Sequence, residues 1–173
     1  MDWYEAAGVY HERTWPLDGR LSVVPAEWQR ELVALMLVNR EVNNGGYVQF
    51  FANRGRETYE YASRALKTIG ARRMAEIVDA CQALIDEHSP NTGQSSDERA
   101  QLLPNRGIGR DGQTVKDEGS VLPGSVLARV SELSYEFMDY PEDVGDLAQA
   151  HYRPLIESDK PAEPGSVLSS GDS

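Results

Sequence analysis

One segment of this chain predicts a sharp corner between two helices: Glu41-Val42-Asn43-Asn44-Gly45-Gly46-Tyr47-Val48-Gln49-Phe50-Phe51-Ala52-Asn53. Before it, apolar residues from Trp28 to Val42 recur with a helical period behind Pro25, a residue that suits the first turn of a helix. Gly45 and Gly46 then stand where a helix C-cap is expected, because glycine adopts backbone conformations that other residues avoid. We expect a short second helix directly after these glycines.

The amides of Gln49 and Asn53 are four residues apart and would share one helix face. There they could hydrogen-bond the free backbone groups of the corner. Amides do not titrate, so they supply neither a nucleophile nor a general base, and the Lys-Ser/Thr pair of a phosphate-binding loop is missing. We therefore interpret the motif as structural, with a ligand pocket as the alternative; its residues are Asn43, Gly45, Gly46, Tyr47, Gln49, Phe50, Phe51 and Asn53.

Helical periodicity continues on both sides of the corner. It predicts helices over 2–13, 57–69, 71–87 and 125–139, and a last helix that starts at Pro141 and is kinked or shortened at Pro154. No strand is clearly signalled. The sequence thus predicts an all-α fold of about five to seven helices, in a single domain over residues 1–157.

Two segments differ from this pattern. Residues 89–124 hold six glycines and three prolines and predict an exposed loop inserted into the domain. Residues 158–173 are polar, contain two further prolines, and predict a flexible tail.

The composition restricts the function classes. The chain has 173 residues with 17 basic and 28 acidic side chains, a formal charge of −11, which argues against direct binding to nucleic acid or an anionic membrane. No apolar run is long enough to span a membrane, and no signal peptide is apparent, so we expect a cytoplasmic protein. A single cysteine excludes a disulfide framework or a cysteine-clustered zinc site, and we predict no cofactor and no metal.

The remaining candidates for chemistry are isolated. His11, His88 and His151 are far apart and show no metal-ligand spacing. Cys81 lies on the apolar stripe of its predicted helix, which favours a buried and unreactive thiol.

The acidity is concentrated in the last third of the chain. Residues 31–80 carry seven bases and six acids, whereas residues 121–173 carry three bases and ten acids, a balance of −7. Glu132, Glu136 and Asp139 are spaced i, i+4, i+7 and form one stripe away from the apolar face of their helix. Glu142, Asp143 and Asp146 extend the acidity past Pro141. The stripe is either a solvated outer face or a surface for a basic partner.

Carboxylates at this spacing imitate DNA only in part. A stripe at i, i+4 presents one charge per roughly 6 Å of helix axis. A single DNA strand presents one phosphate per roughly 3.4 Å and a duplex one per roughly 1.7 Å. A DNA mimic would therefore need several helices or two subunits side by side.

The segment 41–53, followed by Leu66-x-x-Ile69-Gly70-Ala71, resembles the helical family of bacterial DNA-mimic proteins. The resemblance continues through Leu133, Phe137 and Pro141-Glu142-Asp143, and it covers roughly residues 25–88 and 125–157. It implies an all-α fold and an acidic protein without enzymatic activity. It further implies a dimer that presents carboxylates arranged like DNA phosphates to the DNA-binding face of a transcriptional regulator.

We predict a non-catalytic acidic protein that binds a basic DNA-binding protein or regulator and blocks its DNA binding. The predicted contact residues are Glu132, Glu136, Asp139, Glu142, Asp143 and Asp146. An immunity-type protein that neutralises a basic toxin or nuclease would use the same acids. A hydrolase or small-ligand protein working at the 43–53 corner and a purely structural role also stay open, as does a homodimer.

Overall fold

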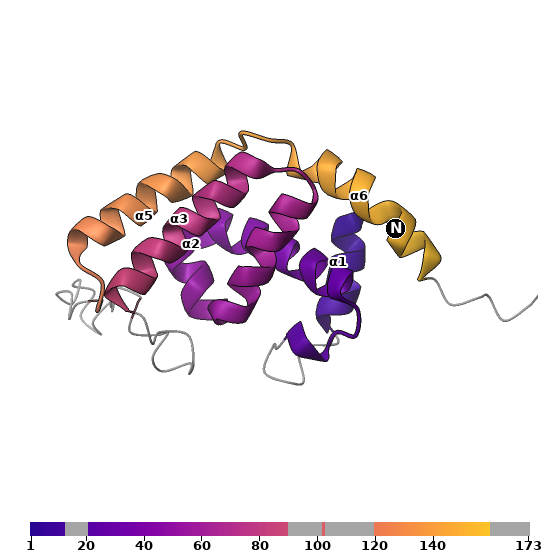
Figure 1. The fold of residues 1–173 in the computed structure, drawn as a ribbon, viewed down its shortest axis with the longest axis horizontal. Coiled ribbons are helices and arrows are strands. Elements are labelled where there is room, and N and C mark those ends of the chain that lie inside the picture. The colour runs from indigo at the N-terminus through magenta and orange to yellow at the C-terminus, as the bar shows by residue number, and fades with distance from the viewer. Residues whose placement is uncertain (13–20, 90–101, 103–119, 160–173) are drawn as a thin grey trace, which may run out of the picture.

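The computed structural model describes residues 1–12, 21–89, 102 and 120–159, and these residues form helices only (Figure 1). The elements are α1 (Trp3–Glu12), a 3-10 helix η2 (Leu21–Val23), α2 (Glu27–Thr68), α3 (Arg72–His88), α5 (Gly124–Met138) and α6 (Val144–Ser158). No strand occurs in the described part of the chain. The predicted all-α fold is confirmed.

The long helix α2 is three helical stretches joined at glycines. Its backbone leaves helical geometry at Gly45, Gly46 and Gly55, which separates stretches 27–44, 47–54 and 56–68. The sequence predicted these stretches and the corner at Gly45-Gly46. It also placed a break near residue 55, without assigning it to Gly55.

The first stretch of α2 is the centre of the molecule. Every residue from 31 to 38 is buried, although the sequence pattern predicted burial of one face only. The reason is that α1, α3, α5, α6 and η2 all pack on α2. Even Glu31 is buried there, where it accepts a hydrogen bond from the hydroxyl of Tyr152 in α6 (3.2 Å).

Helices α1 and α6 pack against each other at one end of the molecule (Figure 1). Trp3, Ala6, Ala7 and Tyr10 of α1 are buried, on the side that the apolar periodicity of the predicted helix 2–13 indicates. The hydroxyl of Tyr10 and the amide of Gln29 both donate to the carboxylate of Asp159, at 2.7 and 3.0 Å. The end of α6 is thereby tied to both α1 and α2.

The predicted start of the last helix is wrong. Helix α6 begins at Val144 rather than Pro141, because the carboxylate of Asp143 accepts a hydrogen bond from the backbone N–H of Asp146 (3.0 Å) and so acts as the N-cap. Pro154 lies inside α6, yet the helix continues to Ser158. Shortening at this proline is therefore also wrong.

The predicted insertion 89–124 is described only at residues 89, 102 and 120–124, and the predicted tail only at 158–159. The predictions for the rest of these segments lie outside the described residues. Leu102 and Leu122 are buried in the core, and the hydroxyl of Ser120 donates to the carbonyl of Leu102 (2.6 Å). Leu102 and Leu122 are therefore packed, whereas Val121, Pro123 and Gly124 are exposed, and the exposed insertion as a whole stays a prediction.

Candidate functional site: a glycine corner, its groove and an acidic helix

The corner depends on Gly46 more than on Gly45. Gly46 has φ 75° and ψ −177°, a combination that is essentially restricted to glycine. A Cβ at this position would also lie 3.1 Å from the hydroxyl oxygen of Ser134 in α5. Gly45, with φ −163°, is extended and requires no special residue, although its neighbour Gln49 packs directly against it.

Ser134 fastens the corner to α5. The backbone N–H of Tyr47 donates to the hydroxyl oxygen of Ser134 (3.0 Å), and this hydroxyl donates to the carbonyl of Val130 (2.8 Å). All three groups are buried, and each polar atom in this row of hydrogen bonds has a protein partner in place of water. The corner and α5 are thus held at one fixed separation.

A buried carboxylate, which the sequence analysis did not single out, joins the two sides of the corner. Glu41 accepts a hydrogen bond from the Asn53 amide (2.9 Å) and two from the Arg54 guanidinium (2.6 and 3.1 Å). The predicted role of Asn53 needs correction here, since its amide binds this carboxylate instead of a backbone group. The acid and the base lie thirteen residues apart across the glycines, a separation that no helical spacing rule highlights.

Burial alone would raise the pKa of Glu41. The hydrogen bonds from Arg54 and Asn53 and the charges of Arg54 and Arg40 outweigh burial, so that the pKa of Glu41 lies below its usual value. Near neutral pH, Glu41 is therefore a charged group that joins the two sides of the corner, and it does not act as a proton donor.

The aromatic motif residues are part of the core. Tyr47, Phe50 and Phe51 are fully buried and each packs against the ring of Tyr59. Their burial supports the structural interpretation of the motif. The hydroxyl of Tyr47 is the one buried side-chain polar atom without a hydrogen-bond partner among the described residues.

Two buried titratable groups near the corner are poorly suited to catalysis. Burial, and to a lesser extent the nearby thiol of Cys81, raises the pKa of Tyr47 well above its usual value. Burial likewise raises the pKa of the Cys81 thiol, far from neutrality. Neither group ionises readily near pH 7, which agrees with the predicted unreactive cysteine.

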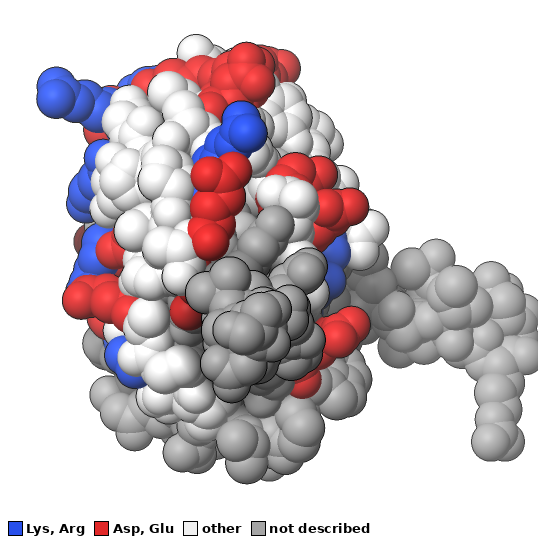
Figure 2. Space-filling view, turned by 90° about the vertical axis from the view of Figure 1, so that its right-hand side faces the viewer, with Lys and Arg blue, Asp and Glu red and all other residues white. Residues whose placement is uncertain are grey.

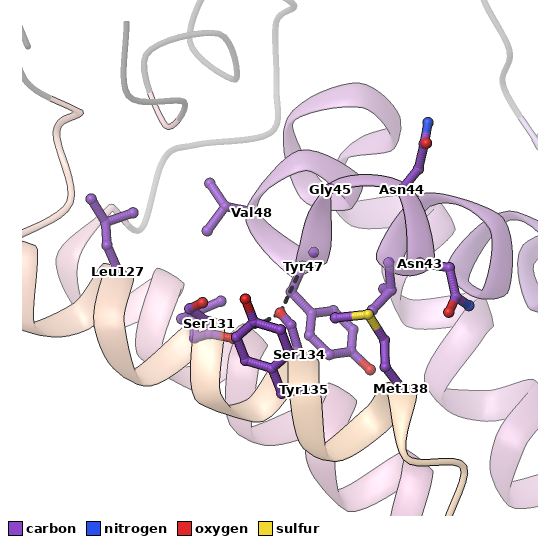
Figure 3. Close-up of a pocket in the computed structure, with 13 residues that line it drawn as sticks. Asn43, Asn44, Gly45, Tyr47, Val48, Leu127, Ser131, Ser134, Tyr135 and Met138 are labelled. Carbon is purple, nitrogen blue, oxygen red and sulfur yellow. Dashed lines mark hydrogen bonds between the residues drawn. The ribbon is translucent and has the colours of Figure 1, made fainter. Parts of the chain in front are cut away.

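A groove of about 350 Å³ lies between the corner and α5 (Figure 3). Val48 lies on the α2 side, while Leu127, Tyr135 and Met138 lie on the α5 side. Among the described residues that line it, Tyr47 and Tyr135 are titratable and none is charged. These residues are Val42, Asn43, Asn44, Gly45, Gly46, Tyr47, Val48, Leu127, Val130, Ser131, Ser134, Tyr135 and Met138.

The predicted acidic stripe lies on the outer side of α5. Glu132 and Asp139 are exposed, and Glu136 is half-buried. Glu132 pairs with Arg129 (2.9 Å), and Glu136 pairs with Arg73 of α3 (2.9 Å) and, more weakly, with Arg129 (3.6 Å). The stripe is therefore surface-exposed and only partly neutralised.

The other three predicted contact acids lie at helix starts. The carboxylate of Glu142 accepts hydrogen bonds from the backbone N–H groups of Arg73 and Met74 (2.8 and 2.9 Å) and so caps α3. Asp143 caps α6, and Asp146 is exposed in the first turn of the same helix. The structure thus gives Glu142 and Asp143 roles in the fold that sequence spacing did not indicate.

The acids do not merge into one continuous patch on the face shown in Figure 2. That view looks onto the end of the molecule on the right of Figure 1, and it shows red groups separated by white surface, with most of the blue atoms along one edge.

The described residues contain no group of His, Cys, Asp and Glu side chains that could hold a metal ion. His88 contacts the carbonyl of Leu84, and His151 packs edge-on against Tyr152 (4.8 Å between centroids). In the same part of the chain, no helix has the length and apolarity needed to cross a membrane.

Comparison with known proteins gives one match. A family model described as DMP19-like protein matches residues 25–154, which span the corner, α3, α5 and most of α6. Searches of curated proteins and of solved structures gave no significant match.

Proposed function

The chain belongs to the DMP19-like family, and from this premise we propose that it is an acidic binding protein that acts as a DNA mimic. It would occupy the DNA-binding face of a basic DNA-binding protein, such as a transcriptional regulator, and exclude DNA from it. The acidic stripe of α5, defined as Glu132, Glu136 and Asp139, would make the central contact.

The observation that carries this proposal is the placement of the stripe where acids do not favour the helix. Asp139 is the C-cap of α5, and the last turn of this helix contains no basic residue. Negative charge near a helix C-terminus opposes the helix dipole. Like charges at i, i+4 cost roughly 0.2–0.5 kcal/mol more. Exposed ion pairs such as Arg129–Glu132 offset little of this. These carboxylates do not stabilise their helix, and binding to a basic partner would explain why they are there.

The stripe alone is sparser than DNA, as its helical spacing requires. The turn that follows α5 carries Glu142 and Asp143, and Asp146 is exposed in the first turn of α6. Glu142 and Asp143 cap helices close to the end of α5, so their carboxylates add to the field around α5. We propose that these acids, or those of a second protomer, supply the remaining charge density.

A catalytic interpretation would place the reaction in the corner groove. Such an interpretation requires a concave pocket and a titratable residue of shifted pKa, and the groove is concave and is lined by Tyr47, whose pKa is shifted. The shift is upward, however, and the phenol oxygen is buried in the core. Because a general acid or base works best with a pKa near the operating pH, this geometry favours binding over proton transfer.

The test compares two triple variants of equal charge. Glu132→Gln/Glu136→Gln/Asp139→Asn removes the stripe. The matched control Glu12→Gln/Glu60→Gln/Glu87→Gln removes three exposed acids from α1, α2 and α3. Each full-length protein is immobilised, exposed to lysate of the native cell and eluted with stepwise salt. A recovered protein is purified and tested in a DNA mobility-shift assay.

We expect wild type and control, but not the stripe variant, to retain a DNA-binding protein that elutes at moderate salt. Wild type should displace DNA from that protein in the mobility-shift assay. Equal retention by both triple variants would contradict the proposal, as would a complex in which the partner holds DNA and this chain together. Recovery of a basic nuclease whose activity is neutralised would favour the immunity-type alternative.

A further inference from the structure

Tyr135 is the most exposed of the large hydrophobic side chains in the described residues, with 66% of its surface accessible. Its ring rises from α5 toward the groove beneath Val48 (Figure 3). Within the described part of the molecule, the side chain of Tyr135 makes no hydrogen bond and its ring contacts no other ring. An exposed aromatic ring beside an open groove is typical of an interface anchor.

Helix geometry places Tyr135 between the groove and the acidic stripe. Apart from Tyr135 itself, the α5 residues that line the groove are Leu127, Val130, Ser131, Ser134 and Met138. At roughly 100° per residue, Tyr135 stands about 85° from the middle of this group and about 40° from Asp139 on the other side. The groove, whose lining combines apolar Val48, Leu127 and Met138 with uncharged polar Asn43, Asn44, Ser131 and Ser134, is therefore next to the carboxylates on one surface, and the Tyr135 ring lies between them.

We propose that this composite surface takes a basic protein segment that carries one large apolar side chain. The apolar side chain would enter the groove against Tyr135, Met138 and Val48, and flanking lysines or arginines would meet the stripe. The inference rests on the proposed function and adds to it how the partner is selected. The phosphate backbone of DNA offers no such groove to the partner's apolar side chain, so the groove contributes affinity that charge imitation does not.

Charge complementarity identifies the occupant. The described residues that line the groove carry no charge, so an apolar group enters between them without leaving one of their charges unpaired. The surrounding stripe and the chain's net charge of −11 attract a basic segment and repel an acidic one. The groove volume of about 350 Å³ is at the low end of the roughly 300–1,000 Å³ of small-molecule sites, which suits one or two side chains.

The test uses two fluorescent helix-forming peptides with identical lysines and arginines. One carries a central leucine and the other an alanine at the same position. Binding to the full-length protein is measured by fluorescence anisotropy at low and moderate salt. The variants are Tyr135→Ser, the stripe triple variant, and Tyr4→Ser as the matched control, because Tyr4 is an exposed tyrosine of α1.

We expect wild type and Tyr4→Ser to bind the leucine peptide about tenfold more tightly than the alanine peptide. Tyr135→Ser should lose this preference and keep the salt dependence of binding. The stripe variant should lose the salt dependence and keep the preference.

Three results would overturn the inference. If both peptides bind wild type equally but depend on the stripe, the groove plays no part and the proposed function stands. If neither peptide binds, both the inference and the proposed function fail. If Tyr135→Ser instead changes the oligomeric state in analytical ultracentrifugation, without affecting peptide preference, a second copy occupies the groove.

Discussion

Among single residues, Glu41 has the clearest consequence for the pH dependence of folding. Its pKa lies below the usual 4.5 in the folded state, so the unfolded chain takes up a proton first as the pH falls. The stabilisation is therefore present above about pH 4.5 and is lost as the pH falls through the lowered pKa. We expect Glu41→Gln to reduce the free energy of unfolding at pH 7 by about 1–3 kcal/mol, because Arg54 loses a charged partner.

Urea unfolding of wild type and Glu41→Gln between pH 3 and pH 7 measures this effect. The two stability curves should converge below about pH 4.5. Glu60→Gln, a change at an exposed acid of α2, serves as control and should leave the curve unchanged. A constant difference between wild type and Glu41→Gln down to pH 3 would show that the carboxylate's charge is irrelevant.

The two glycines of the corner should respond differently to alanine. Gly46 combines positive φ with a Cβ position 3.1 Å from the Ser134 hydroxyl, so Gly46→Ala should cost about 1–3 kcal/mol of stability. The backbone of Gly45 is extended, and a Cβ there would displace only the flexible end of the Gln49 side chain. Gly45→Ala should therefore cost less stability than Gly46→Ala. Thermal unfolding of the two variants measures the order, and equal losses would mean that the left-handed geometry of Gly46 is not required.

At the scale of helices, α3 depends on a cap from outside itself. Its own N-cap residue, Ala71, makes no side-chain hydrogen bond, and Glu142 supplies the acceptor for two backbone N–H groups at this end. We expect Glu142→Gln to lower stability by about 0.5–2 kcal/mol, because the charge-assisted bonds and the favourable dipole interaction are weakened. Hydrogen exchange of the Arg73 and Met74 amides should accelerate. Glu132→Gln, with the same charge change on α5, should leave both amides protected.

The same helices show which features local patterns reveal. Apolar periodicity identified the inner face of α1 and the corner at Gly45-Gly46, because these depend on neighbours a few residues away. The cap of α3 joins residues 69 apart in the chain, and no local pattern contains that pairing. The start of α6 was placed at Pro141 for a related reason. Glu142 and Asp143 looked like first-turn acids of one helix, whereas they cap two different helices.

For the molecule as a whole, composition and periodicity were sufficient for the fold class and for the uneven charge. They were insufficient for the site, because the groove exists only where α5 crosses the corner. Its walls come from 42–48 and 127–138, and the contact between Tyr47 and Ser134 spans 87 residues. Sequence spacing therefore identified the motif and the stripe separately, while only the packed structure places Tyr135 between them.

The global charge leads to a last prediction, which separates acids that support the fold from acids that do not. The stripe variant Glu132→Gln/Glu136→Gln/Asp139→Asn reduces self-repulsion in a chain of charge −11 and removes acids from the C-terminal half of α5. It should be as stable as wild type, or more stable by up to about 1 kcal/mol, in urea unfolding at low salt. Salt should shrink this difference, since exposed charges are screened beyond roughly 10 Å at 0.1 M.

The control triple at Glu12, Glu60 and Glu87 lowers the net charge equally, so a gain specific to the stripe would come from its place on α5. A loss above about 1 kcal/mol in the stripe variant would mean that its pairs with Arg73 and Arg129 hold α3 and α5 together, and the acids would then be explained by the fold rather than by a partner.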